Sequence, residues 1–361
     1  MKIYVYAICK NEEAFAEKWM ASMGEADGVV VCDTGSTDGT AEKLRSLGAA
    51  VYSIVIDPWR FDTPRNVSLD LVPADADICV CTDLDEILEP GWREKLERVW
   101  TPGVTHVRYM YTWRFNPDGT RGHTFWYEKI HARKGYRWVH PVHEVLQYTG
   151  EVPEKYASAP DIQLNHFPDP AKSRGQYLPL LELSHKENPQ DAATTFWLGR
   201  EYMFYSQHDK AIETLKAHLK LESGWDMERC ASMRFIARCW QAKGNTAEAK
   251  RWLYRAIAES PGTREPYVDM AKLAYALSDW QLTYAMAELA LRITEKPTAY
   301  LTEEVCWGFS PYDLGAIAGY RIGLYARSRE LARQACVLCP GDTRLKKNLD
   351  LIGEKCGEAT P

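Results

Sequence analysis

Short apolar runs alternate with amphipathic segments over the first 110 residues of the chain. The expected strands are residues 3–8, 28–33, 50–56 and 77–82. The expected helices are residues 12–23, 40–47 and 61–72. Gly48 would stop the second helix, whereas Thr63 would cap the third, with Pro64 in its first turn. This alternation predicts an α/β fold with an open, mostly parallel sheet and crossover helices.

The pattern changes between residues 105 and 166. This stretch is rich in aromatic and β-forming residues and contains the turn sequence NPDGT at 116–120. Strand-forming segments joined by such a turn are typical of antiparallel pairing. We therefore expect an antiparallel extension beside the parallel sheet.

Beyond residue 170 the pattern is helical and repeats itself. When four helical segments are set in register, small residues share one position, and a second shared position lies seven residues later. The first position holds Ala211, Ala249, Thr283 and Ser328, and the second holds His218, Ala256, Ala290 and Ala335. The offsets of 38, 34 and 45 residues lie close to the 34-residue tetratricopeptide period with insertions. The sequence thus predicts two domains, 1–170 and 171–355, the second with three to four degenerate tetratricopeptide-like units.

Composition narrows the class of protein. A chain of 361 residues exceeds what one hydrophobic core usually supports. No apolar run approaches the roughly 18 residues of a membrane helix, and ten cysteines without a zinc-type spacing are expected to be reduced core residues, so we expect a cytoplasmic protein. The net charge of −6 argues against an extended nucleic-acid surface.

Carboxylates gather where two expected strands end. Asp83, Asp85 and Glu86 follow the fourth strand, and Asp33 ends the second. Ligands of open α/β sheets bind beyond these carboxyl ends, and clustered acids there favour a hard divalent cation that bridges to phosphates. The alternative is that residues 83–86 only favour the start of the next helix.

Several motifs together resemble glycosyltransferase family 2, whose members have the GT-A fold. They are AICKNEE, VVVCDTGSTDGT, FDTPRN and VCTDLDE, in this order and spacing. The sequences WVHPVHEVL, LNHFPD and FWLGREYMF are similar to bacterial family 2 members with tetratricopeptide-like tails, including peptide S-glycosyltransferases that modify bacteriocins. The resemblance covers the chain to about residue 221 and the remainder more loosely.

This resemblance implies roles for several side chains. Asp33 would bind the nucleotide base, uracil or another, and Asp83 the ribose of a nucleotide-sugar donor, with a UDP-sugar favoured. Asp85 would ligate a divalent cation, Mn²⁺ or Mg²⁺, and His166 would complete that site. For His166 the alternative is a core histidine at the end of a strand.

Inverting transfer also needs a base that takes the proton of the acceptor. By the resemblance Glu144 is the first choice, followed by His143 and then by Glu86 or Asp62. The alternative for Glu144 is that it only orients His143 or pairs with an arginine.

Basic and amide side chains would complete the donor pocket. In EKIHARKGYRW, Arg133 matches the family best as a diphosphate ligand, while Lys129 also offers positive charge, and Lys134 and Arg137 are expected on a solvated hairpin. The resemblance assigns Arg65 and Asn66 to the pocket, against the alternative of helix packing.

Other functions remain open at this point. A nucleotidyltransferase would carry a glycine-rich loop after the first strand, where this chain has CKNEE. A non-catalytic tetratricopeptide scaffold with a degenerate transferase domain is the main alternative. The repeats suit a peptide or protein acceptor, although the same helices would also serve to form a homodimer.

Overall fold

The computed structural model describes residues 1–170, 172, 175–222 and 225–358. The chain divides into two compact units, Met1–Asn188 and Pro189–Pro361, which we describe separately. The first helix beyond the sheet, α5 (Tyr177–Glu187), belongs to the first unit, so this division falls later in the chain than the expected boundary at residue 170.

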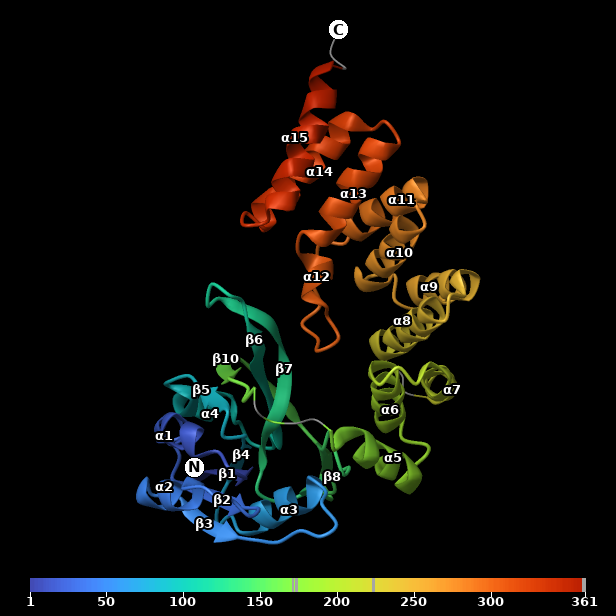
Figure 1. Cartoon of the computed structure of the whole chain (residues 1–361). Coiled ribbons are helices and arrows are strands. Elements are labelled where there is room, and N and C mark those ends of the chain that lie inside the picture. The colour runs from blue at the N-terminus through green and yellow to red at the C-terminus, as the bar shows by residue number, and fades with distance from the viewer. Residues whose placement is uncertain (171, 173–174, 223–224, 359–361) are drawn as a thin grey trace. The chain divides into compact units, whose positions relative to one another are not determined.

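The first unit is built on a mixed eight-stranded sheet, with a separate two-stranded sheet (Figure 1). Its strands are β1 (Ile3–Cys9), β2 (Gly28–Asp33), β3 (Ala50–Ser53), β4 (Ile78–Cys81), β5 (Glu86–Leu88), β6 (His106–Phe115), β7 (Arg121–Ala132), β8 (Tyr136–Val139), β9 (Val145–Tyr148) and β10 (Tyr156–His166). Its helices before α5 are α1 (Glu13–Ser22), α2 (Thr40–Ser46), α3 (Asp62–Asp70) and α4 (Trp92–Val99). The large sheet has the order β3-β2-β1-β4-β7-β6-β10-β5, and β8 pairs with β9.

The four N-terminal strands are parallel, and two of them form the centre of the core. All four residues of β4 are buried and all but one of β1, which lies between β2 and β4. The predicted α/β class with a mostly parallel sheet and an antiparallel extension is confirmed, because β7 runs antiparallel to both β4 and β6. The edge strand β5 also runs antiparallel to β10, whereas β10 is parallel to β6.

Two local predictions for this unit are wrong. The third strand ends at Ser53 rather than at residue 56, because its last paired residue lies opposite Asp33, where β2 itself ends. Thr63 does not cap the third helix, because α3 begins one residue earlier, at Asp62. Phe61 occupies the cap position, and its backbone N–H donates to the carbonyl of Pro141 at 2.8 Å.

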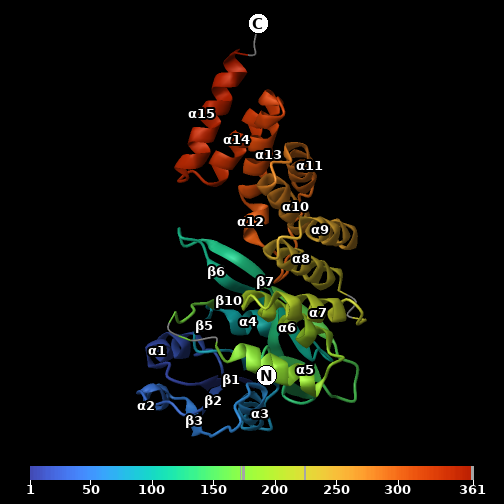
Figure 2. The ribbon, with the colours of Figure 1, turned by 45° about the vertical axis from the view of Figure 1, so that its right-hand side comes forward.

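The second unit consists of helices that pack as consecutive antiparallel pairs (Figures 1 and 2). Its helices are α6 (Ala192–Phe204), α7 (His208–His218), α8 (Asp226–Ala242), α9 (Thr246–Glu259), α10 (Glu265–Ala276), α11 (Trp280–Leu291), α12 (Glu304–Trp307), α13 (Ser310–Arg321), α14 (Tyr325–Leu338) and α15 (Thr343–Glu358). The pairs are α6–α7, α8–α9, α10–α11 and α13–α14. All eight residues at the two shared positions of the predicted repeat are buried, which confirms the predicted register.

The four helix pairs also share one turn. Ser206, Gly244, Ser278 and Gly323 have positive φ angles, of 57°, 76°, 57° and 85°. After each of them, a backbone N–H donates to a carbonyl five residues back, which is the Schellman arrangement that ends a helix. These four residues have the same offsets of 38, 34 and 45 as the small-residue positions, so the repeat is present in backbone geometry as well as in packing.

The described helices and cysteines agree with what the sequence indicated about membrane segments and thiols. None of the described helices is both long enough and apolar enough to cross a membrane. Cysteines whose side chains the structure describes are free, and Cys79 and Cys81 lie in one core cluster with Tyr6 and Trp138, as expected of reduced core residues.

Candidate active site

Acidic side chains meet at the carboxyl ends of β2 and β4, on either side of the end of β1. Asp33 is the last residue of β2 and lies opposite Cys9 of β1. Its carboxylate accepts hydrogen bonds from the backbone N–H of Ser36 at 3.1 Å and from the Ser36 hydroxyl at 2.5 Å. The turn that follows β2 thus holds Asp33 in place although the side chain is almost completely buried.

Arg65 connects Asp83, which follows β4, with the predicted base Glu144. It projects from α3, is only 3% exposed, and packs against the ring of Trp138. Its Nη2 lies 2.5 Å from Asp83 Oδ1, and its Nε donates to Glu144 Oε1 at 3.0 Å. Burial alone would raise the pKa of Asp83, but Arg65 and Lys129 outweigh burial and hold that pKa well below its usual value.

Lys129 is a second cation of this cluster. Its Nζ lies 3.2 Å from Asp83 Oδ2 and 3.9 Å from Glu86 Oε2. The register explains this position, because β7 runs antiparallel to β4 with Ile130 opposite Val80, so the residue before Ile130 lies near the carboxyl end of β4.

Arg133, expected to bind the diphosphate, lies at the other end of β4, so the structure does not bring it together with the acids at the carboxyl end. The residue before it, Ala132, pairs with Ile78 at the start of that strand. Its guanidinium donates to the carbonyls of Val72 and Asp70. Arg133 follows Lys129 by four residues on the antiparallel strand, so it lies near the amino end of β4. There its hydrogen bonds hold the segment at the end of α3.

Asp85 and His166 form a pair beside this cluster. The pairing of β5 with β10 puts His166 opposite Glu86, and His166 Nε2 lies 3.5 Å from Asp85 Oδ2. His166 Nδ1 hydrogen-bonds the carbonyl of Trp113 at 3.1 Å, and the two rings stack with centroids 4.4 Å apart. Burial lowers the pKa of His166, but the Asp85 carboxylate outweighs it and raises that pKa.

This pair has the donor atoms that a cation site needs. When a cation replaces the proton on Nε2, and Nδ1 keeps its proton toward the Trp113 carbonyl, His166 offers the Nε2 lone pair to that cation beside Asp85. A carboxylate oxygen and an imidazole nitrogen suit Mn²⁺, and the oxygens of a diphosphate would supply further ligands. Within the described ranges no group of three or more His, Cys, Asp or Glu side chains could hold a metal ion.

Two residues that the sequence did not single out complete this edge of the sheet. Glu12, just before α1, is buried and forms an ion pair with Lys172, whose Nζ also lies 3.9 Å from Asp85. Burial raises the pKa of Glu12 to about 7, an effect that Lys172 partly offsets. Glu12 also lines a pocket of about 660 Å³ with Asn11, Glu13, Ala14, Phe15, Glu17, Asp38, Lys43 and Asp169.

The loop that carries Glu144 has an unusual backbone. His140 and His143 both have positive φ angles, of 77° and 52°. Such conformations are costly for residues other than glycine, and they gather at functional sites. The ring of His143 packs edge-on against Tyr177. Glu144 Oε2 makes no hydrogen bond with any residue that the structure describes, whereas its Oε1 is held by Arg65.

Three other predicted side chains, those of Asp62, Glu86 and Asn66, form hydrogen bonds with neighbouring residues. Asp62 is held by Arg60 through hydrogen bonds of 2.6 and 2.7 Å. Glu86 is buried, accepts from the Tyr111 hydroxyl at 2.8 Å, and has its pKa raised by burial. The Asn66 amide exchanges two 2.9 Å hydrogen bonds with the backbone of Trp138, so it holds β8 against α3.

Comparison with known proteins gives partial matches. No protein-family model matches the chain. Over 131 residues the chain is 28% identical to "Lipopolysaccharide core biosynthesis glycosyltransferase LpsC" of Rhizobium meliloti (strain 1021). The match covers 34% of this chain and 48% of that relative, so it spans about half of the relative's length. This similarity supports a glycosyltransferase relationship for part of the chain.

Two solved structures resemble parts of the chain. The Cut9–Hcn1 hetero-tetramer of the APC/C aligns with a TM-score of 0.40 and 16% identity, covering 50% of this chain and 33% of that one. YrrB, described as a TPR protein with an unusual peptide-binding site, aligns with a TM-score of 0.40 and 12% identity, covering 50% of this chain and 84% of that one. At these scores neither structure informs the function of this chain.

Proposed function

We propose that this protein is a metal-dependent inverting glycosyltransferase that moves a hexosyl group from a nucleotide sugar, with UDP-sugars favoured, to an acceptor. The observation that carries the proposal is the cluster at one edge of the sheet, where Arg65 joins Asp83 to Glu144 beside the Asp85–His166 pair. The similarity of part of the chain to a glycosyltransferase supports it. The whole activity, its donor and its acceptor are proposals.

In this proposal the two aspartates at the strand ends bind the nucleoside. Asp33 accepts a hydrogen bond from the base, and Asp83 accepts from the ribose hydroxyls. Each carboxylate oxygen has two lone pairs, so Asp83 can bind the ribose and keep its contacts with Arg65 and Lys129. Those two cations hold Asp83 ionised and fixed before the donor arrives.

Asp85 and His166 would hold the divalent cation, and a cation there would supply positive charge to the departing diphosphate. Lys172, with its Nζ 3.9 Å from Asp85, adds a second positive charge to this side of the site. The paired carboxylate of Glu12 keeps Lys172 close to that position.

Glu144 is the proposed base. Arg65 fixes Oε1, and Oε2 takes the proton of the acceptor nucleophile as that atom forms its bond to the anomeric carbon. The bond between the anomeric carbon and the diphosphate oxygen breaks, and the diphosphate leaves with the electron pair. Attack opposite the leaving group inverts the anomeric centre.

The acceptor is proposed to be a peptide or protein, because packed helix pairs of this kind form extended binding surfaces. A non-catalytic scaffold remains the competing function. One observation favours it, namely that Asp83 is held by two cations of the protein itself.

A donor screen separates the two functions. UDP-, GDP- and dTDP-sugars are incubated with the full chain, with and without Mn²⁺, and release of the nucleoside diphosphate is measured. We expect hydrolysis of at least one donor that requires the cation and is lost in Asp85→Asn but kept in Glu187→Gln, which changes an acid paired with Arg60 away from the strand ends. If no donor is hydrolysed and none binds, the transferase proposal is wrong and the non-catalytic scaffold is the function supported.

A further inference from the structure

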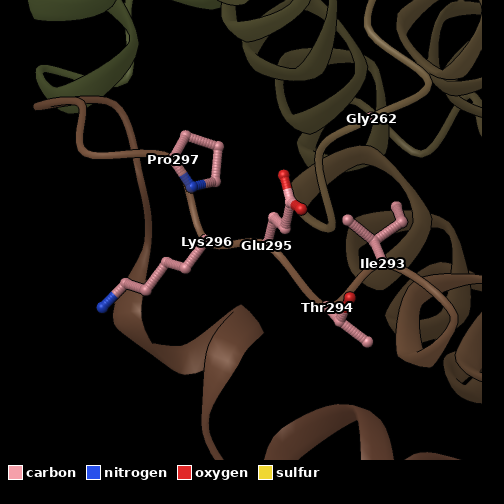
Figure 3. Close-up of a pocket in the computed structure, with 6 residues that line it drawn as sticks. All are labelled: Gly262, Ile293, Thr294, Glu295, Lys296 and Pro297. Atoms are coloured by element: carbon pink, nitrogen blue, oxygen red, sulfur yellow. The ribbon is translucent and has the colours of Figure 1, made fainter.

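The segment between α11 and α13 departs from the repeat. The offset of 45 residues there exceeds the other two, of 38 and 34, and the additional residues lie at 293–303, before α12. Figure 3 shows where the segment leaves α11, with residues 293–297 and Gly262 around a pocket of about 480 Å³.

The insertion is closed at its base by its own contacts. Lys296 Nζ lies 2.6 Å from a carboxylate oxygen of Glu304, and the Thr302 hydroxyl donates to the carbonyl of Pro297 at 3.0 Å. The residues between these contacts are therefore presented as a short loop with fixed ends. A loop of this kind loses little conformational entropy when its tip binds.

The tip of the loop places Tyr300 among aromatic residues of earlier repeats. The Tyr300 ring stacks on Trp197 of α6 with centroids 5.5 Å apart, and it lies 5.4 Å from the ring of Trp225. Its hydroxyl donates to Glu228 of α8 at 2.5 Å. A single side chain thus contacts two consecutive helix pairs.

Three residues later the loop places a carboxylate against two arginines. Glu303 accepts from Arg234 Nη2 at 2.7 Å and from Arg238 Nη2 at 3.0 Å, both on α8. The same arginines are shared with Asp269 of α10. The backbone N–H of Glu303 donates to Glu265, also on α10, at 3.0 Å.

One carboxylate of the helices, Asp269, pairs with both arginines. Arg234 is 2% exposed in its side chain and Arg238 only partly exposed, and Asp269 is the acid that α10 supplies to both guanidinium groups. Glu303 from the insertion provides the second carboxylate. Buried guanidinium groups need such partners, because an unpaired buried charge is costly. The surface formed by α6, α8 and α10 is therefore complementary to a segment with an aromatic ring followed by a carboxylate.

We propose that this surface is a peptide-binding site for acidic segments with an aromatic residue three positions before a carboxylate, and that residues 300–303 occupy it as a displaceable internal ligand. An external peptide with the same chemistry binds when it replaces Tyr300 and Glu303. This inference concerns the helical unit and does not depend on the proposed transferase activity.

The test uses a fluorescent peptide with the sequence of residues 297–305, PTAYLTEEV, and its binding to the full chain by anisotropy. In one variant residues 298–303 are replaced by a Gly-Ser linker of equal length, and a second is the double substitution Tyr300→Ala with Glu303→Gln. Thr298→Ala, at an exposed position of the same loop, is the matched control. The control ligand is the same peptide with the residues that correspond to Tyr300 and Glu303 changed to Ala and Gln.

The two loop variants are expected to bind the peptide at least tenfold more tightly than the wild type or Thr298→Ala, because the tethered segment competes at an effective concentration in the millimolar range. The control peptide should bind at least tenfold more weakly than PTAYLTEEV. If a folded loop variant binds both peptides equally, or neither, the proposal is overturned. Loss of helical circular dichroism in both variants would also overturn it, since the segment would then be part of the fold rather than a ligand.

Discussion

The buried histidine His131 allows the pH dependence of the unfolding free energy to be predicted from the structure. His131 of β7 is completely buried; its Nε2 lies 2.8 Å from the Tyr6 hydroxyl, which in turn accepts from Trp138 Nε1 at 2.8 Å. Since the Tyr6 hydroxyl donates onward to Nε2, the imidazole is neutral with its proton on Nδ1, toward the carbonyl of Ala132 at 2.8 Å. Trp138 is the residue that packs against Arg65, so this chain of hydrogen bonds supports the site.

Burial lowers the pKa of His131 from 6.5 to about 3. Below pH 6.5 His131 is protonated in the unfolded chain, whereas in the folded chain it stays neutral down to about pH 3. The neutral buried imidazole therefore stabilises the folded chain fully above pH 6.5, and this stabilisation is lost on acidification. With 1.36 kcal/mol per pKa unit, the loss between pH 7 and pH 5 is about 2 kcal/mol of unfolding free energy. His131→Gln should remove this part of the pH dependence.

Native-state hydrogen exchange of the full chain measures the effect, because it reports the two compact units separately. Rates for amides of β1, β4 and β7 are compared at pH 7 and pH 5 after correction for intrinsic exchange. Subtracting the variant from the wild type cancels the other titrating groups, and we expect a difference of about 2 kcal/mol. An equal decline in wild type and His131→Gln would refute the reasoning, because the imidazole would then not be the group that resists protonation.

Further predictions concern the proposed activity and can be measured together. Glu144→Gln should lower kcat about 10²- to 10⁴-fold with little change in donor affinity, as expected for a base; a change in affinity alone would contradict that role. Asp33→Ala should weaken UDP binding about 10- to 100-fold, since it removes a charged hydrogen-bond acceptor, but leave Mn²⁺ binding unchanged; equal loss of both would contradict the division between base and metal sites. Lys129→Gln should reduce donor turnover because it removes a cation that holds Asp83, whereas Arg133→Gln should lower only the thermal midpoint; the reverse order would contradict the role given to Lys129.

Much of the fold could be predicted because it depends on local patterns. The buried runs of β1 and β4 and the small residues such as Ala249 and Ser328 have periodicities that follow directly from packing. The end of β3 could not be predicted from its own apolar run, because it depends on where the neighbouring strand β2 ends, at Asp33.

The site was predicted less completely, for reasons of register and distance. The choice between Lys129 and Arg133 depends on the antiparallel alignment of β7 with β4, which no local pattern specifies. Glu12 and Lys172 are 160 residues apart and pair only in the folded chain. Glu12 lies within the AICKNEE motif, but neither the motif nor its lack of glycine indicated that this glutamate is buried and paired with Lys172.

The central claim is that Asp85 and His166 bind a cation together with a nucleotide diphosphate. Isothermal titration of UDP into the full chain tests it most directly, with and without Mn²⁺, for the wild type, Asp85→Asn and Glu187→Gln. The account predicts that Mn²⁺ tightens UDP binding at least tenfold in the wild type and in Glu187→Gln, and that this increase disappears in Asp85→Asn. UDP binding that ignores Mn²⁺, or a cation effect that survives Asp85→Asn, would contradict the account.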